Sequence, residues 1–338
     1  MKIHQNFSLK PYNSFGVDAY ADFFVTVRSI RDIHTFLSSL TESPAPILLL
    51  GSGSNILFTQ DFHGTVIHNN ILGINLSKED SEHVWLEVGA GENWHSFVLY
   101  CIDHQYAGAE NLSLIPGTVG AAPIQNIGAY GVELESIVDS VTAIHLETCE
   151  QRIFSHEECQ FGYRDSLFKH TLKNQFMISS VTFRLNKKFK ANLEYQVLKQ
   201  TLLHKKILTP TLKDISDTVI EIRQQKLPDP KKLPNAGSFF KNPFVSIAHF
   251  KQLQHNYPAI PFFEGDKTHI KLSAAWLIDT CGLKGITEHG VGISPTHALV
   301  LVNYESHSGK DILHLSQKIQ QIVYQKYSIH LEAEVNIL

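Results

Sequence analysis

Apolar and polar positions along the first 70 residues predict short strands around one helix. Residues 22–27, 45–51 and 64–69 form short apolar runs rich in branched and aromatic side chains, which are typical of strands. Residues 29–40, between the first two runs, carry apolar side chains at the three- and four-residue spacing of a helix: Ile30, Ile33, Phe36, Leu37 and Leu40.

The middle of the chain contains further strands and a second helix. Residues 93–105 fit an amphipathic helix with one apolar side. Strand patterns occur at 83–91, 138–148, 149–154 and 176–185. Residues 110–134 show neither the spacing of a helix nor the alternation of a strand, yet they are apolar and rich in glycine. Disordered linkers, in contrast, are polar. We therefore expect an ordered loop there.

The pattern changes after Arg184, where a basic stretch leads to a predicted helix near 214–226. Leu227–Pro234 ends that helix because proline cannot continue it, so we place a domain boundary there. Two more helical stretches and two strands follow, at 271–282, 310–325, 297–303 and 328–338. Because helices and strands do not alternate strictly, the pattern favours an α+β fold over a doubly wound sheet.

Two glycine-rich segments carry the first functional signal. In LLLGSGSNILF (48–58), Gly51 and Gly53 match a dinucleotide-binding fingerprint, but Ile56 occupies its third glycine position and no helix pattern follows. No Gly-Lys-Ser/Thr follows either, which excludes a P-loop. We interpret the segment as a strand–turn–strand nest whose N–H groups bind phosphate, with an ordinary tight turn as the alternative.

The second glycine-rich segment is 110–134. Small residues there allow the backbone to approach a flat ring or a pyrophosphate closely. Gln125 and Asn126 would be costly to bury without hydrogen bonds, which a ligand could supply. Two such loops in one domain suggest a dinucleotide cofactor lying across both, whereas a buried Ω-loop that serves only packing is the alternative.

Composition excludes several classes of protein. The 338 residues allow two or three domains, and 43% apolar with 18% charged residues is an ordinary globular balance. A net charge of −4 provides no broad footprint for nucleic acid. The 19 histidines include no H-E-x-x-H motif, so we expect no metal site.

Cysteine usage and hydropathy suggest a compartment. The four cysteines form no C-x-x-C pair and are scattered, which suggests reduced thiols in a cytosolic protein. We see no secretory signal in the first 16 residues and no apolar run near 18 residues. We therefore expect a cytoplasmic protein with no membrane partner.

Seven segments, taken together and in order, carry a specific resemblance over nearly the full chain. They are NSFG (13–16), LGSGSNILF (50–58), VGAGENWH (88–95), IPGTVGAAPIQNIGAYGVE (115–133), FGYRDSLFK (161–169), KLPDPKKLPNAGSFFKNP (226–243) and SAAWLIDTCGLKG (273–285). In these segments the chain resembles the UDP-N-acetylenolpyruvoylglucosamine reductase family of bacterial peptidoglycan synthesis.

The resemblance implies a vanillyl-alcohol-oxidase-type (PCMH-type) FAD-binding fold of two α+β subdomains plus a C-terminal α+β substrate-binding domain. We expect these at 1–70, 71–226, with a substrate loop near 188–200, and 227–338. It implies that FAD is bound non-covalently, with NADPH as hydride donor. The implied FAD-binding residues are Gly51, Ser52, Gly53, Ser54, Asn55, Pro116, Gly117, Gly120, Ala121, Gln125, Asn126, Gly128, Ala129 and Gly131.

The resemblance also implies a reaction and its catalytic residues. The flavin N5 hydride reduces C3 of the enolpyruvyl double bond of a UDP-sugar, giving UDP-N-acetylmuramate. Arg164 would stabilise the enolate-like carboxylate, although a local ion pair with Asp165 is the alternative reading. Ser238 would protonate C2, although a turn serine is its simpler reading. Glu334 would assist Arg164, although alternation places it with Glu332 on what could be a solvated strand face.

Further positions resemble substrate contacts. Tyr195, Lys226, Asn242 and, less clearly, Arg223 match residues that meet the UDP-sugar diphosphate or the nicotinamide nucleotide, and Tyr195 assigns the chain to the longer branch of the family. The chain departs from the family in two places. It has Asn336 where a basic residue is common and His297 where Gln is common, which puts substrate contacts in doubt.

Two other functions remain open from the sequence. A flavin oxidase of the same fold class would need neither NADPH nor a proton donor at Ser238. A non-catalytic nucleotide-sugar binding module would need no FAD. For all three, the expected partners are small molecules, and we expect a monomer.

Overall fold

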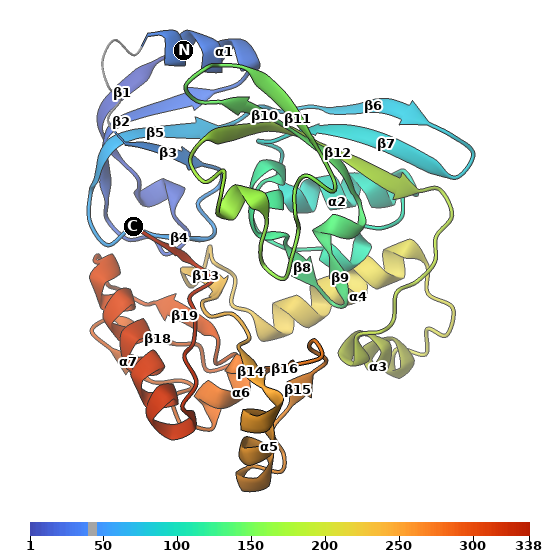
Figure 1. Cartoon of the computed structure of the whole chain (residues 1–338), viewed down its shortest axis with the longest axis vertical. Helices are drawn as coiled ribbons and strands as arrows, with labels where there is room; N and C mark the ends of the chain where they lie inside the picture. The colour runs from blue at the N-terminus through green and yellow to red at the C-terminus, as the bar shows by residue number, and fades with distance from the viewer. Residues whose placement is uncertain (40–45) are drawn as a thin grey trace. The chain divides into compact units, whose positions relative to one another are not determined.

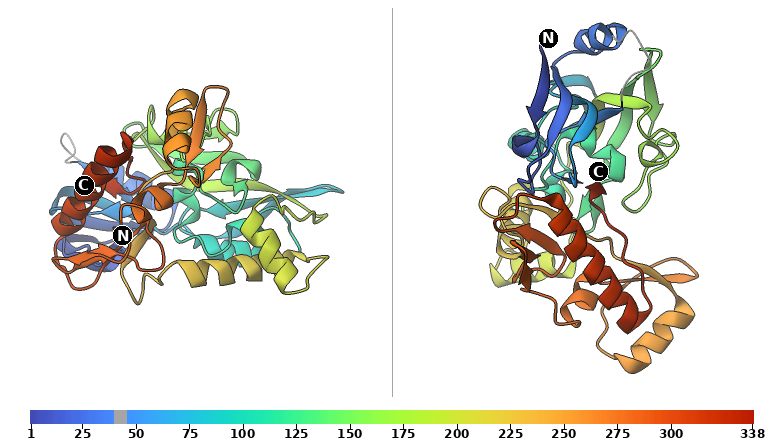
Figure 2. Two further views of the ribbon diagram at one scale, coloured as in Figure 1. Left: turned by 90° about the horizontal axis from the view of Figure 1, so that it is seen from below. Right: turned by 90° about the vertical axis from the view of Figure 1, so that its left-hand side faces the viewer.

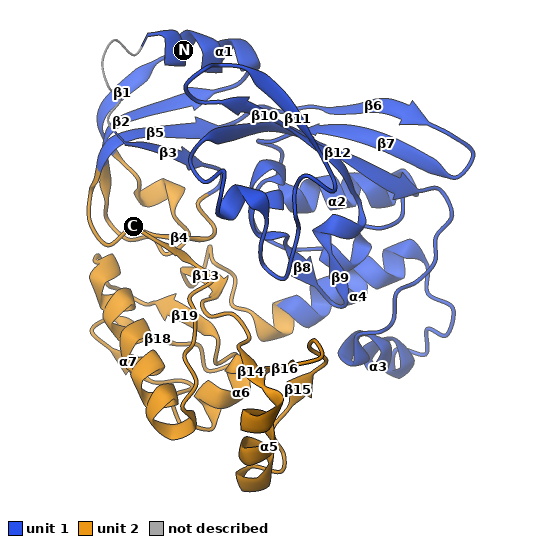
Figure 3. Ribbon diagram, viewed as in Figure 1, with its two compact units in different colours: residues 1–7, 21–52, 63–223 blue, residues 8–20, 53–62, 224–338 orange. Residues whose placement is uncertain are grey.

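The computed structural model describes residues 1–39 and 46–338, and these form two compact units (Figure 3). Unit 1 comprises Met1–Phe7, Ala21–Ser52 and His63–Arg223, and unit 2 comprises Ser8–Tyr20, Gly53–Phe62 and Gln224–Leu338. The chain therefore passes between the units within the first glycine-rich segment, between Ser52 and Gly53.

A four-stranded sheet lies near the start of the chain, in the order β1-β2-β5-β3 (Figure 1). Its strands are Ile3–Ser8 (β1), Tyr20–Val27 (β2), Ile47–Leu50 (β3) and Phe62–Asn69 (β5). Helix α1 (Ile30–Ser38) begins at Ser29, whose hydroxyl accepts the N–H of Asp32. The apolar side of α1 packs with apolar residues of the strands.

A five-stranded antiparallel sheet forms the larger part of unit 1, in the order β11-β10-β12-β7-β6. Its strands are Ile74–Glu79 (β6), His83–Gly89 (β7), Val138–His145 (β10), Gln151–Ser155 (β11) and Phe176–Asn186 (β12). Helix α2 (Trp94–Asp103) lies against this sheet, where Trp94 and Phe97 contact Phe183 (Figure 1). These aromatic contacts belong to the main hydrophobic core of the unit.

The second glycine-rich segment folds as short 3-10 turns and a hairpin. The turns are Glu110–Leu112, Val119–Ala121, Pro123–Gln125 and Leu134–Ser136, and the hairpin pairs Gly128–Ala129 (β8) with Val132–Glu133 (β9). Helices α3 (Gln196–His204) and α4 (Leu212–Lys226) follow. Their apolar residues pack with Tyr130 of the hairpin and Tyr195. Two more 3-10 turns span Lys10–Tyr12 and Leu167–Lys169.

Unit 2 is built on a four-stranded sheet in the order β13-β19-β18-β17, beside which α7 (Gly309–Tyr327) runs (Figure 2). The strands are Asn235–Ser238 (β13), Thr287–Glu288 (β17), Val291–Ile293 (β18) and Val300–Asn303 (β19). A smaller sheet, β14-β16-β15, comprises Phe244–Ser246, His269–Leu272 and Phe262–Phe263. Two helices, α5 (Ile247–Asn256) and α6 (Ala274–Asp279), lie between these strands in sequence.

A parallel pair completes unit 2. Strand β4 (Ile56–Leu57), directly after the first glycine-rich turn, pairs with β20 (Asn336–Ile337). Thr59 extends the pairing, because its N–H donates to the carbonyl of Leu338 at 2.7 Å. Two segments far apart in the sequence therefore fix the strand that leaves the turn.

Most strands and helices predicted from the sequence are confirmed. The ranges that correspond are 22–27, 64–69, 83–91, 93–105, 138–148, 176–185, 214–226 and 310–325. Residues 110–134 are the ordered, irregular segment that was expected. Leu40 of the predicted helix and Ala45 of the predicted strand lie outside the described residues. The domain ranges 1–70, 71–226 and 227–338 stay a prediction.

The strand predicted at 328–338 is wrong over most of its length. Only Asn336–Ile337 is a strand, and Ala333 forms an isolated bridge with Phe240. The alternation is confirmed in part: Ile329, Leu331 and Val335 are buried and Ala333 is half-buried, whereas Ile337, expected on the same inward face, is exposed. Burial thus follows the pattern, whereas continuous strand pairing does not.

No helix of the described residues is long and apolar enough to cross a membrane. Within residues 1–39 and 46–338, no three or more His, Cys, Asp or Glu side chains are grouped so that they could hold a metal ion.

Candidate active site

The two glycine-rich segments meet in unit 1. A Cβ atom on Gly51 would lie 2.5 Å from Oγ1 of Thr118, so only glycine allows this approach. Gly120 lies equally close to the chain, because its Cβ would be 2.5 Å from Cβ of Ala90. The prediction that both loops lie along one ligand requires them to be neighbours, and Gly51 and Thr118 are.

Beyond Ser52, the same turn continues in unit 2. Gly53 adopts a φ of +67°, and a Cβ there would overlap the carbonyl oxygen of Tyr12. The N–H of Ser14 donates to the carbonyl of Gly53 at 3.0 Å. Asn55 is tied to the catalytic candidate Glu334, since its Nδ2 donates to the Glu334 carbonyl at 3.2 Å. The turn is thus fixed by backbone contacts on both sides.

Both loops retain backbone donors for an anion. Within the part of the chain that the structure describes, the N–H groups of Ser52, Gly53 and Ser54 donate to no acceptor, and neither do those of Ile115 and Gly117. Successive N–H groups of this kind bind phosphate well.

A buried hydroxyl points to the same ligand class. The Oγ atom of Ser14, beside Gly53, is buried with no hydrogen-bond partner among the described residues. A buried hydroxyl is costly unless something satisfies it. In the same unit, Gly53 and Ser54 have N–H groups without an acceptor among the described residues, so this part of the turn is suited to an anion.

One argument made from the sequence loses its support at Asn126, because the protein itself supplies the hydrogen bonds that a ligand could have supplied. Asn126 is fully buried and needs no ligand, because its Nδ2 donates to Glu133 and to the carbonyl of Gly162, each at 3.0 Å. Its Oδ1 accepts the N–H of Glu135 at 3.0 Å. A direct FAD contact by its side chain is therefore not needed to explain its burial. The other candidates in this segment are exposed or half-buried, apart from Gly120: Pro116, Gly117, Ala121, Gln125, Gly128, Ala129 and Gly131.

Arg164 is held in unit 1 by the β8–β9 hairpin. Its Nη2 donates to the carbonyl of Gly128 at 2.7 Å, and its Nη1 lies 3.8 Å from a carboxylate oxygen of Glu133. The residue adopts a φ of +55°, and 18% of its side chain is exposed. Asp165, the partner in the alternative reading, pairs with His170 at 2.7 Å. The guanidinium is therefore positioned by the glycine-rich segment.

Arg223 and Tyr195 lie in the same unit. Nε of Arg223 donates to the carbonyl of Leu114 at 3.2 Å, and the N–H of Leu114 donates to Nδ1 of His95 at 3.0 Å. Burial lowers the pKa of Arg223, Tyr130 opposes that effect, and Arg164 adds to it. Burial also lowers the pKa of His95, with a smaller contribution from Arg223. The ring of Tyr195 meets that of Tyr130 edge-on at 5.2 Å.

Ser238 and Glu334 are brought together in unit 2 by backbone pairing. Ser238 ends β13 opposite Val300, and the N–H of Glu334 donates to the carbonyl of the next residue, Phe239, at 2.8 Å. Ser238 is half-buried, and its hydroxyl makes no hydrogen bond with any described residue. Glu332, the other glutamate of the pair, is exposed and forms an ion pair with Lys241. The two glutamates therefore have different surroundings, and the choice of Glu334 over Glu332 stays a prediction.

Lys226 and Asn242 have different surroundings in unit 2. Lys226 is exposed, and it contributes, after burial and together with Lys284, to a lowered pKa of His297. Oδ1 of Asn242 accepts the N–H of Ala274 at 3.0 Å, so it caps α6. A diphosphate contact by Asn242 is thus restricted to its Nδ2 donor.

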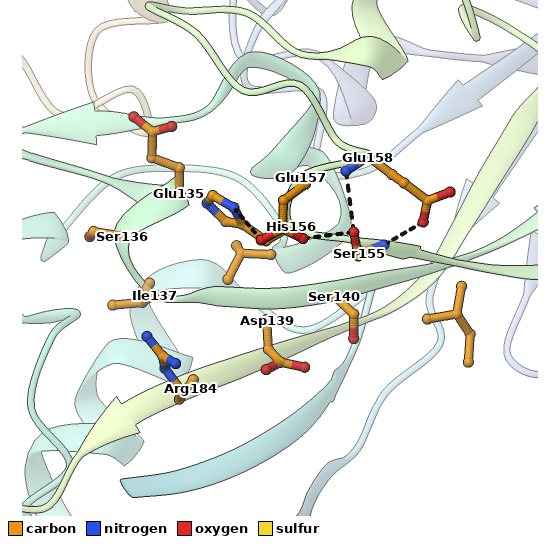
Figure 4. Close-up of a pocket in the computed structure, with 12 residues that line it drawn as sticks. Glu135, Ser136, Ile137, Asp139, Ser140, Ser155, His156, Glu157, Glu158 and Arg184 are labelled. Carbon is orange, nitrogen blue, oxygen red and sulfur yellow. Dashed lines mark hydrogen bonds and ion pairs between the residues drawn. The ribbon is translucent and has the colours of Figure 1, made fainter.

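Sequence reasoning missed several residues of these groups. Ser14, His95, Asn111 and Tyr130 all lie inside or beside segments that carried the resemblance, and that position was the only available signal. It also missed an open hollow of about 780 Å³ along β10 and β11 (Figure 4). Acidic side chains such as Asp139 and Glu157 line it, but none of the candidate site residues does.

The fold and the loop donors define a flavoprotein of the vanillyl-alcohol-oxidase (PCMH) type, and known families support this. Residues 21–153 match the FAD binding domain family. Residues 229–338 match the family described as UDP-N-acetylenolpyruvoylglucosamine reductase, C-terminal domain. The chain belongs to the UDP-N-acetylenolpyruvoylglucosamine reductase family, and it is accordingly an oxidoreductase that uses FAD.

Relatives match along their whole length. The chain is 45% identical to a UDP-N-acetylenolpyruvoylglucosamine reductase of Flavobacterium johnsoniae, covering 100% of both chains. It is 47% identical to one of Amoebophilus asiaticus, again over 100% of both. A solved reductase of that name from Thermus caldophilus has the same fold, with a TM-score of 0.68, 24% identity and coverage of 100% of this chain and 99% of that one.

Proposed function

We propose that this protein uses NADPH to reduce the enolpyruvyl group of UDP-N-acetyl-3-O-(1-carboxyvinyl)-glucosamine to the lactyl ether of UDP-N-acetylmuramate, a step of peptidoglycan synthesis. The observation that carries the proposal, beside family membership, is the unbonded Ser238 hydroxyl held next to Glu334. The enzyme would act in the cytoplasm as a monomer.

The residues that would hold FAD are those of the two glycine-rich segments. Gly51 and Gly120 allow the close packing of the loops. The N–H groups of Ser52, Gly53 and Ser54, and those of Ile115 and Gly117, would be the donors for its diphosphate. The chemistry that bound FAD supplies is hydride transfer, from NADPH to C3 of the enolpyruvyl group.

Ser238 would deliver the proton to C2. Adding hydride to C3 places the electron pair of the double bond on C2, beside the carboxylate, and that carbanion is a strong base. A hydroxyl is a weak acid, but it suffices where it is aligned with such a base. Because no described residue accepts a hydrogen bond from Ser238, its proton is available to the substrate.

Arg164 and Glu334 would manage the developing charge. A guanidinium stays protonated at any physiological pH and can bind a carboxylate through two N–H groups. Arg164 is already oriented by Gly128 and Glu133, so little reorganisation is needed when negative charge forms on the substrate carboxylate. Glu334 is oriented by its backbone bonds to Phe239 and Asn55.

Tyr195, Arg223, Lys226 and Asn242 would bind the diphosphates of the UDP-sugar and of NADPH. Arg223 is the half-buried cation of this set, and Lys226 is an exposed one that can move to meet a phosphate. The Nδ2 atom of Asn242 is its remaining donor, since Oδ1 caps α6.

Visible spectroscopy during an anaerobic titration tests the function. The purified protein should be yellow, lose its visible flavin absorbance with NADPH, and regain it when the enolpyruvyl sugar is added. In a second experiment, stopped-flow mixing of the reduced protein with air measures the rate at which oxygen reoxidises the flavin. Reoxidation by oxygen that outpaces reoxidation by the sugar would instead establish an oxidase. A colourless protein that cannot be loaded with FAD would establish a binding module.

A further inference from the structure

Asn111 is a buried polar residue that the proposed reaction does not use. It lies in the 3-10 turn Glu110–Leu112, and 1% of it is exposed. Its Nδ2 donates to two carbonyls from separate segments, that of Tyr130 at 2.9 Å and that of Asn192 at 3.2 Å. Its Oδ1 has no partner among the described residues. Burying an amide whose oxygen has no partner costs free energy. The two bonds that its Nδ2 donates are therefore the contacts whose role needs an explanation.

The two carbonyls belong to the segments that carry a tyrosine pair. Tyr130 lies in the turn of the β8–β9 hairpin with a φ of +50°. Asn192 lies three residues before Tyr195, in the segment that enters α3. The rings of Tyr130 and Tyr195 meet edge-on with centroids 5.2 Å apart, and both pack against apolar residues of α3 and α4. Asn111 therefore joins the backbones that place these rings.

Other ties between the two segments are weak. Nδ2 of Asn192 reaches the carbonyl of Gly131 at 3.5 Å, the limit of a hydrogen bond. Side-chain capping does not fix the start of α3, because Tyr195 occupies the N-cap position without a side-chain bond. The Asn111 amide is thus the strongest polar link from the glycine-rich segment to the arm 192–195.

We propose that Asn111 is a positioning residue for substrate binding, which ties the arm 192–195 to the β8–β9 hairpin and so holds Tyr195 in place. The inference rests on the proposed function, because it takes Tyr195 to contact the UDP diphosphate. Asn111 itself touches no reacting atom. Its loss should weaken the binding of UDP compounds while leaving the reduction chemistry intact once they are bound.

The test measures UDP binding to the oxidised holoenzyme by the perturbation of the flavin spectrum, together with the rate of flavin reoxidation at saturating enolpyruvyl sugar. Asn111→Leu has nearly the same shape and removes both donor bonds. We expect about tenfold weaker binding of UDP, in line with two lost hydrogen bonds, and a saturated rate within about twofold of the parent.

A double-mutant cycle separates positioning from general damage. In a Tyr195→Ala background, Asn111→Leu should change UDP binding by less than about twofold, because the residue it positions is gone. Ser113→Ala is the matched control. Ser113 is equally buried and loses bonds to Glu110 and Ser216, but it contacts neither tyrosine. It should leave UDP binding unchanged.

Several outcomes would overturn the inference. They are an equal loss of binding in both backgrounds, a comparable loss in Ser113→Ala, or a fall in the saturated rate with unchanged affinity. If Asn111→Leu fails to retain FAD, Asn111→Ala removes the same two donor bonds with a smaller side chain and must show the same loss of UDP affinity. If the parent holoenzyme binds UDP and reduces the sugar but the variants do not lose UDP affinity, the positioning role is refuted and the proposed function stands.

Discussion

Arg164 in unit 1 and Ser238 in unit 2 are held in opposite ways. The Arg164 side chain is fixed at its tip by a carbonyl of Gly128 and the carboxylate of Glu133. Ser238 is fixed only through its backbone, at the end of β13, and its hydroxyl is bonded to no described residue. The guanidinium of Arg164 is thus oriented by direct contacts, whereas Ser238 is held by its backbone and its hydroxyl is left without such contacts.

This difference follows from the work proposed for each group. A charge that stabilises developing negative charge acts best when its orientation is set beforehand, since reorganisation then costs nothing at the moment of reaction. A proton donor must instead give its hydrogen to the substrate, and any internal acceptor would compete for it. The comparison therefore predicts that removing the Ser238 hydroxyl lowers the rate of sugar reduction. For Arg164, changes in the neighbouring residues that orient its side chain should lower that rate as well.

The largest expected effect is that of Ser238→Ala. Removing a general acid should lower the rate of sugar reduction about 10²–10⁴-fold, while flavin reduction by NADPH stays near the parent value. Stopped-flow absorbance of the two half-reactions measures both. Ser246→Ala is a control in the same unit, because that hydroxyl only caps α5 by accepting the N–H of His249. Equal damage to both half-reactions in Ser238→Ala would contradict the assigned role.

Next in size is Arg164→Met, which keeps the length of the side chain and removes its charge. Loss of one preorganised group that stabilises charge costs about 10²–10³-fold in rate, so sugar reduction should fall by that order. Arg164→Lys should recover only part of it, because an ammonium cannot reproduce the planar two-point contact. Rates at saturating sugar check this. Full recovery by lysine would show that charge alone, without orientation, is sufficient.

A smaller effect is expected from Gly128→Ala, which disturbs Arg164 without touching the substrate. The new Cβ would lie 2.8 Å from Nη1 of Arg164 and 3.1 Å from the carbonyl of Val132. A displacement of this kind should slow sugar reduction about tenfold, since catalysis depends on placement within a fraction of an ångström. At Gly162, also beside Arg164, an added Cβ meets only Cβ of Asp165 at 3.8 Å, an ordinary contact. Gly162→Ala should therefore leave the rate of sugar reduction unchanged. Equal rate losses in Gly128→Ala and Gly162→Ala would refute the steric argument.

The smallest expected effect concerns pH and His297. Burial, followed by Lys226 and Lys284, lowers the pKa of His297 in the folded protein. Below the unfolded pKa of about 6.5, the unfolded chain binds the proton more readily, so stability falls as the pH decreases toward the folded pKa. The slope is at most about 1.4 kcal/mol per pH unit for one proton. Urea unfolding of His297→Gln should show a flatter acid dependence, and an unchanged profile would contradict this.

Local patterns allowed much of the fold to be predicted, but not the partners that position the site. Alternation from Ile329 to Val335 was visible because burial follows a period of two. The strand expected there is largely absent because its partner, residues 239–241, offers only an isolated bridge and two backbone bonds. No local pattern reports such a distant partner.

The site shows the same limit. Arg164 was found through the resemblance, but its contacts with Gly128 and Glu133 join residues more than 30 positions apart. A ligand was considered as one source of hydrogen bonds for a buried Asn126, whereas its actual partners Glu133, Gly162 and Glu135 could not be identified from the sequence. Residue types at a site are thus readable from the sequence, whereas the contacts that orient them require the fold.

The pairing of β4 with β20 has a consequence for how the cofactor is acquired. Thr59 and Leu338 are 279 residues apart, and at roughly 5–20 residues per second a ribosome needs on the order of 15–60 s to make the intervening chain. Until residues 336–338 emerge, the strand that leaves the first glycine-rich turn lacks its hydrogen-bonding neighbour. If this turn binds the FAD diphosphate as proposed, we expect flavin capture to follow the synthesis of these last residues.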